Sequence, residues 1–450
     1  MDQLSSLPAL SSSRRAELRG WTLLALGSLA IAGVLALLLV LDRTPKLGEL
    51  MPWSGMFFYR ALVTHVVLSF QIWFLAVLAA LSVLASGAGR TGWYGFTALG
   101  AGVGGVVLLL VPALGDVGEP SLNNYIPVLV HPLFIAGLAI HAAGVAMAVL
   151  RLVPGLLTQR APATFGIAAA GVMYLAALAC IAIAAYAIPA GTETSLFLER
   201  LFWGGGHVLQ LVNTAMLMVA WQILSEREYG AGPLPPMLAR AAFAALLAFA
   251  LLAPAIYLRT DVLGLAHRQA FTALLWIGLP LPPMVMGAGL AVRLWRGPRN
   301  WRSTAQLSLL LSLLVFAIGG FAGWFLGVGD TRTPSHYHAV IGGVNLGLMG
   351  VFAVVLLPLL SGPRAGGRSE RLQFYFYGGG QFIHALGFFM AGAAGVPRKT
   401  AAAAQGLDTL FKQVAMGLVG IGGAIAVIGG VMFVWSALRR LLARRGRPDA

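Results

Sequence analysis

Cysteine is nearly absent from this sequence, because Cys180 is the only one among 450 residues. A disulfide framework is therefore excluded, and so are a covalent C-x-x-C-H haem site and a two-cysteine copper site. Charge is scarce as well: only 10% of the residues are Asp, Glu, Lys or Arg, whereas 59% are hydrophobic. This composition predicts an integral membrane protein.

Long apolar runs dominate the chain instead. Because about 20 apolar residues cross a bilayer as a helix, we predict an all-α integral membrane bundle of twelve transmembrane helices. The predicted helices are 21–41, 61–85, 92–115, 125–150, 165–188, 196–224, 237–258, 268–292, 304–327, 335–361, 372–394 and 409–437. The connections are too short for another soluble domain. We therefore predict one membrane domain (21–437), a cytoplasmic N-terminal segment (1–20) and a basic cytoplasmic tail (438–450).

The formal net charge of +15 is distributed unevenly between the two predicted faces. If the N-terminus is cytoplasmic, the inner face has 20 Lys and Arg against 6 acidic residues, and the outer face has 10 against 9. This asymmetry follows the positive-inside rule. It predicts that both termini are cytoplasmic and that the basic residues contact anionic lipid. It argues against nucleic acid as a partner.

Two histidines begin one of the predicted helices. His336 and His338 follow the polar segment 330–335 and precede a long apolar run. Residues two apart on a helix lie about 200° apart around its axis, so the two imidazoles are expected to point to opposite sides. A histidine inside a bilayer is costly unless it lines a site or has a partner. The pair therefore indicates two cofactor planes, one on each side of the helix.

Five of the eight histidines fall at one predicted depth, in the outer half of the membrane. They are His65, His207, His267, His336 and His338. Histidines that only pack a core would scatter in depth, so this layer predicts metal or haem sites. One member of the 336/338 pair can join a histidine of another helix in a six-coordinate haem, and the other can hold a five-coordinate haem. His207 and His267 remain to bind a metal above the open haem face, since neutral imidazole suits iron and copper.

Four motifs carry a resemblance to a known family over nearly the whole chain. They are "FWGGGHVLQ" around His207, "AHRQAFT" around His267, "SHYHAVIGGVNLGLMG" from Ser335 and "FIHALGFFMAGAAGVPRKT" from Phe382. With twelve helices and His65 on the second, they resemble the catalytic subunit (subunit I) of the haem-copper oxidase superfamily. Their order, spacing and common depth carry more weight than any one of them.

The resemblance implies two haems, whose type the sequence leaves open, and one distal copper or non-haem iron. His65 and His338 would be the axial ligands of a low-spin haem, and His336 the proximal ligand of a high-spin haem. His207 and His267 would bind the distal metal. Arg398 and Lys399 would pair with haem propionates, with His384 contributing a hydrogen bond.

The sequence departs from the family at the distal metal. The family usually has two adjacent histidines after the seventh helix, and the second position here is Arg268. We expect Gln210, Glu199 or Asp261 to supply an oxygen as the third metal ligand, and oxygen donors favour iron over copper. Glu199 has two further interpretations, as a proton relay or as an interfacial partner of a nearby arginine.

A second departure concerns the substrate. Most oxygen-reducing members of the family have a tyrosine four residues after the sixth-helix histidine, and that position here is Leu211. Another branch takes its tyrosine from the seventh helix, where Tyr257 is the only candidate. Nitric oxide reductases of the superfamily lack this tyrosine, and the sequence is closest in pattern to divergent members of that group. We therefore expect an oxidoreductase that reduces nitric oxide to nitrous oxide.

Two other functions remain open from the sequence. The first is that of an O2-reducing cytochrome c or quinol oxidase subunit I. The second is that of a non-catalytic membrane subunit that transfers electrons through haem. Electrons are expected from a partner subunit with a cupredoxin or cytochrome c type centre, or from quinol. The expected location is the bacterial inner (plasma) membrane.

Overall fold

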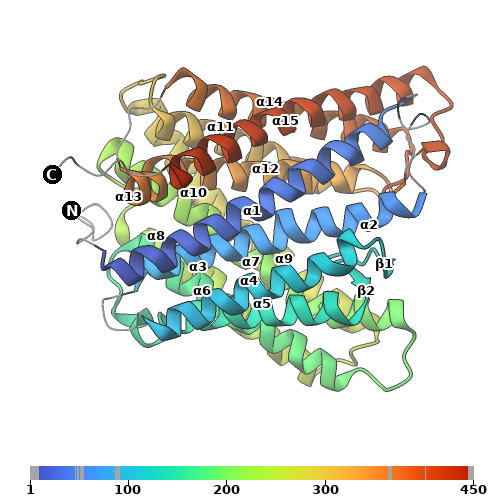
Figure 1. Cartoon of the computed structure of the whole chain (residues 1–450), viewed down its shortest axis with the longest axis horizontal. Coiled ribbons are helices and arrows are strands. Elements are labelled where there is room, and N and C mark those ends of the chain that lie inside the picture. The colour runs from blue at the N-terminus through green and yellow to red at the C-terminus, as the bar shows by residue number, and fades with distance from the viewer. Residues whose placement is uncertain are drawn as a thin grey trace. The chain divides into compact units, whose positions relative to one another are not determined.

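A computed structural model describes residues 10–45, 47, 50, 55–86, 92–362, 367–400 and 402–443. Figure 1 follows the chain through its helices. The long helices are α1 (Ser12–Arg43), α2 (Gly55–Val66), α3 (Trp73–Ala85), α4 (Trp93–Leu114), α5 (Pro132–Leu150), α6 (Pro162–Ala187), α7 (Thr194–Tyr229), α8 (Pro236–Leu252), α9 (Leu265–Gly278), α10 (Leu281–Arg296), α11 (Thr304–Ala322), α12 (Arg332–Val351), α14 (Arg368–Ala393) and α15 (Leu410–Leu442). A five-residue helix, α13 (Leu357–Ser361), follows α12.

The chain divides into two compact units, which are described separately below. Unit 1 contains Met1–Ala25 and Val66–Arg293, and unit 2 contains Leu26–His65 and Leu294–Ala450. Short π-helical turns join α2 to α3 (Val67–Ile72) and α12 to α13 (Phe352–Leu356). Such turns occur mostly inside α-helices and frequently near functional sites. His65 lies two residues before the first of them.

The all-helical membrane fold predicted from the sequence is confirmed. Among the described residues, eleven helical segments are long and apolar enough to cross a membrane. The predicted span 372–394 corresponds to α14, a 26-residue helix that is not among the eleven. Its glycines, tyrosines, glutamines and histidine make it less apolar than the others. Residues 1–9 and 444–450 of the predicted terminal segments lie outside the described residues.

Some predicted helix starts are wrong; α1, for example, begins at Ser12 rather than at residue 21. The span predicted from residue 125 begins as a helix only at Pro132, where His131 caps it by accepting the backbone N–H of Leu133. The residues before it form a hairpin, in which β1 (Glu119–Ser121) pairs antiparallel with β2 (Val128–Val130). The apolar run Val128–Val130 extends the hydrophobic stretch in the sequence, which is why the sequence predicts an earlier start for this helix. Backbone pairing with β1 keeps this run extended, and the proline at the first helical position marks where the helix begins.

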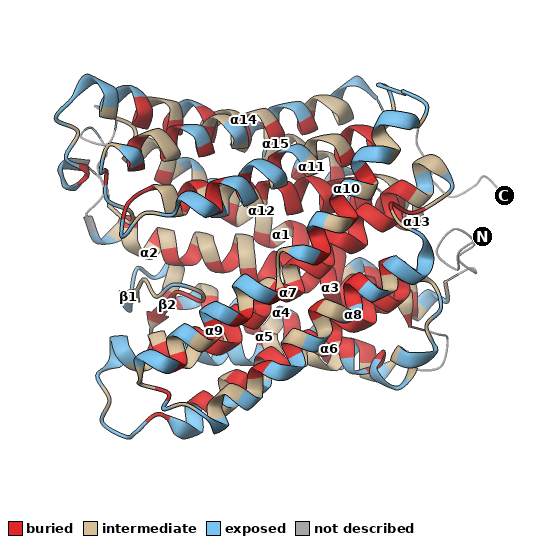
Figure 2. Cartoon of the chain, turned by 180° about the vertical axis from the view of Figure 1, so that it is seen from behind, coloured by how far each residue is buried: buried red, intermediate tan, exposed pale blue. Residues whose placement is uncertain are grey.

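Glycines bring the helices of unit 1 close together. Where α4 meets α5, a Cβ on Gly105 would touch backbone atoms of His141, and one on Gly137 would touch the backbone of α4. His141 is buried, and its Nδ1 lies 3.0 Å from the Gly102 carbonyl oxygen of α4. Small residues at such crossings are typical of membrane helices, which associate through close backbone packing. Figure 2 shows the heavy burial of α3 and α7 in this unit.

Glycines also allow α14 and α15 to pack closely in unit 2. A Cβ on Gly380, Gly387, Gly422 or Gly429 would collide with backbone atoms of the facing helix. The low hydropathy of α14 therefore has a structural cause, since glycine lowers hydropathy and permits this contact. The most apolar part of the span that contains α12 is 83% buried.

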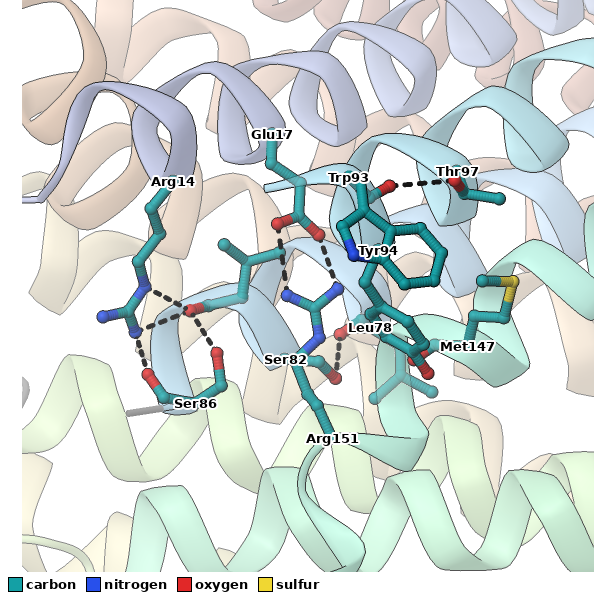
Figure 3. A network of polar contacts seen from close by, with 11 residues as sticks. Arg14, Glu17, Leu78, Ser82, Ser86, Trp93, Tyr94, Thr97, Met147 and Arg151 are labelled. Carbon is teal, nitrogen blue, oxygen red and sulfur yellow. Dashed lines mark hydrogen bonds and ion pairs between the residues drawn. The ribbon is translucent and has the colours of Figure 1, made fainter. Parts of the chain in front are cut away.

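A buried polar network secures the start of α1 in unit 1 (Figure 3). Glu17 forms an ion pair with Arg151, 2.6 Å between Oε1 and Nη2, and both side chains are almost fully buried. Arg14 donates to the carbonyl oxygens of Val83, Leu84 and Ser86. These carbonyls lie at the end of α3, where the helix has no partners of its own for them.

Candidate functional site

Two histidines predicted as metal ligands meet in unit 1. His207 of α7 donates its Nδ1–H to the Trp203 carbonyl, with 2.6 Å between the heavy atoms. His267 of α9 lies 2.9 Å from the Thr260 hydroxyl, which donates its own hydrogen to the Ile256 carbonyl and therefore accepts from His267 Nδ1. Both rings thus hold their proton on Nδ1 and present a lone pair on Nε2, the arrangement that metal-binding histidines use.

Aromatic side chains enclose this pair. The ring of Phe271 lies 5.7 Å from that of His207 and 5.0 Å from that of His267, centroid to centroid. Tyr257 contacts the His267 ring edge-on at 4.7 Å. His207 is 2% exposed and His267 is fully buried. The His267 Nε2 atom has no hydrogen-bond partner among the described residues, and a buried imidazole lone pair of this kind suits a metal.

The three glycines of "FWGGGH" make room for the neighbours of His207. A Cβ on Gly204 would meet the phenol oxygen of Tyr257, and a Cβ on Gly206 would meet the Cβ and ring of Tyr125. A Cβ on Gly205 would meet side-chain and backbone atoms of α6. The motif therefore admits two tyrosines beside the histidine pair.

Tyr125 is a site residue that the sequence analysis did not identify. Its hydroxyl lies 2.9 Å from His207 Nε2, and the two ring centroids are 4.5 Å apart. Burial, followed by the charge of Glu199, raises the pKa of the Tyr125 phenol, so the group stays protonated at neutral pH. The phenol therefore donates to the nitrogen of His207 that would bind a metal.

Glu199, a predicted third ligand or proton relay, lies on α7 two turns before His207. Its Oε1 accepts a hydrogen bond of 2.9 Å from the side-chain amide of Asn124. It lines a hollow of about 550 Å³ together with Glu119 and Glu193. The carboxylate thus has a polar partner in the loop between the two strands.

The other two predicted oxygen donors are not brought into a metal cluster. Asp261 is exposed, and its Oδ1 accepts the backbone N–H of Leu263. Gln210 is half-buried on α7, three residues after His207. Among the described residues, no three His, Cys, Asp or Glu side chains are grouped as a metal site. Neither Glu199 nor Asp261 therefore completes a three-donor set with the histidines in this structure.

Arg268 follows His267 in α9. Its guanidinium carbon lies 4.7 Å from the centre of the Trp203 ring, a stacking that suits the planar guanidinium. The side chain therefore adds a cation beside the site and supplies no lone pair for a metal.

In unit 2, His336 is held by α11. Its Nδ1 donates to the Gly319 carbonyl, 2.7 Å away. A Cβ on Gly323 would lie 2.8 Å from the same ring, so the imidazole packs into the space that the glycine leaves. The hydroxyls of Thr331 and Ser335 donate to carbonyl oxygens of α14 and fix the start of α12.

His338 faces a different helix from His336, as the spacing predicts. Its ring contacts His384 of α14 at 4.7 Å and stacks on Phe388 at 5.4 Å. His65 of α2 donates its Nδ1–H to the Ala32 carbonyl of α1, 2.9 Å away, and lies within electrostatic range of His338. The two predicted axial ligands and His384, whose Nδ1 is 2.7 Å from a carbonyl oxygen of α15, therefore form one cluster.

A half-buried arginine, Arg43, accompanies this cluster and was missed from the sequence. The guanidinium of Arg43 lies between two rings, 5.1 Å from Phe58 and 5.7 Å from Phe388. Its Nε has no hydrogen-bond partner among the described residues. Both Arg43 and Arg398 interact electrostatically with Tyr337, the residue between the two histidines. Asp42 also interacts electrostatically with Arg43, and a haem propionate would be a further anion for this guanidinium.

The predicted propionate-binding loop is tied to the start of α12. The backbone N–H of Arg398 donates to the Gly329 carbonyl, and Lys399 has a positive φ of 59°. Hydrogen bonds from Arg332, aided by its charge and that of Arg398, lower the pKa of Asp330, so this carboxylate remains ionised. Arg398 and Lys399 thus lie in the loop that meets the helix of His336 and His338.

The residues present fit a metal in unit 1 and haem in unit 2. The rings of His207 and His267 both pack against Phe271, and the His267 Nε2 atom has no hydrogen-bond partner among the described residues. In unit 2, His65 and His336 give Nδ1–H to backbone carbonyls, which turns Nε2 away for an axial bond. The fold and these clusters therefore define an all-helical, multi-pass membrane protein with histidine side chains oriented to bind metal or haem.

Comparison with known proteins identifies the family. A family model described as cytochrome c and quinol oxidase polypeptide I matches residues 18–434. The chain belongs to this family, the subunit I family of haem-copper oxidases. An uncharacterised protein of Aquifex aeolicus (strain VF5) is 28% identical and shares 75% of this chain and 83% of its own length. An uncharacterised protein of Rickettsia prowazekii (strain Madrid E) is 23% identical, over 95% of this chain and 96% of its own.

A solved structure has the same fold. The cryo-EM structure of a heme-copper terminal oxidase dimer matches with a TM-score of 0.73 and 18% identity, over 97% of this chain and 86% of that chain. At this identity the likeness establishes the fold of the chain.

Proposed function

We propose that this protein is a membrane-bound oxidoreductase of haem-copper type that reduces nitric oxide to nitrous oxide. Two NO molecules, two electrons and two protons give one N2O and one water. The observation that carries the proposal is the pair His207 and His267, whose Nδ1 protons are donated to protein oxygens. Their Nε2 lone pairs are therefore left for other partners, and that of His267 has no hydrogen-bond partner among the described residues. Electrons would come from a cupredoxin or cytochrome c type partner, or from quinol.

The residues proposed to hold the cofactors keep the sequence assignments. His65 and His338 would bind a low-spin haem, His336 a high-spin haem, and His207 with His267 a distal copper or iron. When bound, these groups supply electron transfer and bind the substrate. The protein's part is to orient the imidazoles, to exclude water with rings such as Phe271, and to balance propionate charge.

Basic side chains of unit 2 are proposed to bind the propionates. Arg398, Lys399 and His384 retain this role from the sequence analysis, and Arg43 joins them because its buried Nε atom has no hydrogen-bond partner among the described residues. A charge-assisted bond from Arg43 to a propionate would add to its electrostatic interaction with Asp42.

Nitric oxide is favoured as substrate by the residue beside His207. Cleavage of O2 takes four electrons, and the family's oxidases draw one from a tyrosine four residues after this histidine. Leu211 stands there, and it is aliphatic and fully buried. Reduction of NO needs two electrons per pair of molecules and requires no oxidisable side chain.

Reduction of O2 is the second candidate because of Tyr257. Its ring contacts His267 at 4.7 Å, and its phenol oxygen is buried without a hydrogen-bond partner among the described residues. A phenol in that position has the chemistry to supply an electron and a proton.

The test is NO and O2 consumption by the purified complex with an artificial electron donor, with metals quantified on the same sample. We expect NO turnover to exceed O2 turnover, and a Tyr257→Phe variant to retain NO reduction. Rapid O2 reduction that Tyr257→Phe abolishes, without NO turnover, would establish the second candidate instead. Two haems with no distal metal and no turnover would indicate an electron-transfer subunit.

A further inference from the structure

The phenol of Tyr125 reaches the nitrogen atom of His207 that is oriented for a metal. We propose that Tyr125 Oη is the oxygen ligand that completes the distal metal centre with His207 and His267. This inference rests on the proposed function, because it takes the two histidines as metal ligands. It gives the centre a third protein donor from outside the long helices.

The distance between the two atoms suits ligands of one metal. Nitrogen and oxygen donors bind such a metal at about 2.0–2.2 Å, so two neighbouring ligands at angles of about 90–110° lie roughly 2.9–3.5 Å apart. Tyr125 Oη and His207 Nε2 are 2.9 Å apart. A metal can therefore take the place of the hydrogen atom between them with little movement of either ring. The displaced proton passes to water, as metal binding to protein ligands generally releases protons.

The two carboxylates predicted from the sequence as oxygen donors are engaged or exposed. Glu199 accepts from the Asn124 amide, and Asp261 is exposed and accepts from a backbone N–H. Among the described residues, no group of three or more His, Cys, Asp or Glu side chains is placed to hold a metal ion. Tyrosine is not one of these four residue types, so a tyrosine oxygen is an additional candidate for the third ligand.

The fold holds Tyr125 in place from two sides. Tyr125 lies in the loop that the pairing of β1 with β2 closes. The backbone carbonyl of Tyr125 accepts a hydrogen bond of 3.4 Å from Gln71 of the π-helical turn Val67–Ile72. On the other side, the absence of a side chain at Gly206 lets the ring lie against α7. Tyr257 also borders the pair, but its phenol oxygen lies against Gly204 and has no bond to either imidazole.

The experiment compares full-length wild-type protein with Tyr125→Phe and with Tyr174→Phe. The control loses a phenol of the same unit that is buried and donates to the Ala142 carbonyl at 3.0 Å. Distal metal per two haems is measured after dialysis against chelators of graded strength, and resonance Raman spectra of the oxidised protein are searched for tyrosinate-to-metal bands. We expect Tyr125→Phe to weaken distal metal binding at least ~10-fold and to lose the bands. Tyr174→Phe should change neither.

Haem content reports the folding of each variant. Deuterated tyrosine in the wild-type protein should shift the same bands, which tests the ligand without any substitution. Wild-type metal retention and unchanged spectra in Tyr125→Phe would overturn the inference and leave the phenol as a hydrogen-bond donor only. If His207→Ala also kept the distal metal, the proposed function itself would fail.

Discussion

The imidazoles of both units share one arrangement at the scale of single residues. Each donates or lies within bonding distance through Nδ1 to an oxygen of the protein, which orients Nε2 toward a ligand. The rings in question are His65, His207, His267, His336 and His384. The oxygen bonded to Nδ1 fixes the orientation of each ring. A substitution that disturbs one ring should therefore weaken the binding of the cofactor at that ring and leave the other cofactors bound.

A substitution at Gly323 tests whether the orientation of the His336 ring determines the binding of the high-spin haem. In Gly323→Ala the new Cβ would lie 2.8 Å from the His336 ring, closer than packed atoms allow, so the ring must shift. We expect the high-spin haem signal to fall while the low-spin spectrum is kept. The optical spectrum and haem content of the purified protein measure both.

Gly320→Ala is the matched control, because a Cβ there meets nothing within 4 Å. Gly320 lies near the end of α11, three residues before Gly323, and its substitution should leave both haem signals intact. Equal loss of both signals in Gly323→Ala, or no loss at all, would contradict the assignment of His336 as the proximal ligand.

At the scale of elements, the helices were predictable because about 20 apolar residues are needed for each span. Most predicted boundaries fall within a few residues of the helices found, as with 165–188 against α6. The β1–β2 hairpin was missed because its strands are only three residues long and one is apolar. Local pattern cannot separate such a strand from the helix that follows it.

The histidines of the candidate site were also predictable from the sequence, whereas Tyr125 and Arg43 were not. Histidines within apolar helices are visible in a sequence, and the opposite faces of His336 and His338 follow from helical geometry. Tyr125 was missed because its contact with His207 joins residues 82 apart in sequence. Arg43 was missed because a charged residue at the end of a span has the appearance of an ordinary interfacial residue.

Packing of α1 against α3 and α5 depends on the Glu17–Arg151 ion pair. The Arg151 side chain has an exposed fraction of 0%, so removal of the carboxylate in Glu17→Ala leaves a buried cation uncompensated. We expect a loss of about 3–5 kcal/mol of stability, measured by unfolding of the detergent-solubilised protein. The double variant Glu17→Ala with Arg151→Met should recover part of the loss.

Asp408→Ala serves as the control, because it removes an ion pair with Lys412 whose carboxylate side chain is 72% exposed. Solvent screens such a pair, so little change is expected. A Glu17→Ala variant as stable as Asp408→Ala would show that the buried pair does not hold α1.

At the scale of the whole molecule, the distribution of charge and the lone cysteine permit a direct test of topology. The basic residues between α10 and α11 are predicted to be cytoplasmic, and the loop before α15 is predicted to be external. Cys180 is buried, so it contributes little to labelling by a reagent that cannot cross membranes.

Two single substitutions therefore report the two faces. Asp408→Cys and Arg299→Cys both replace exposed residues, which gives a thiol that water-soluble maleimide can reach. In intact cells we expect Asp408→Cys to be labelled and Arg299→Cys to be labelled only after permeabilisation. The unsubstituted protein should remain unlabelled in both conditions. The opposite pattern would reverse the membrane orientation and place the Arg398–Lys399 loop on the cytoplasmic side, where the proposed haem layer would then also lie.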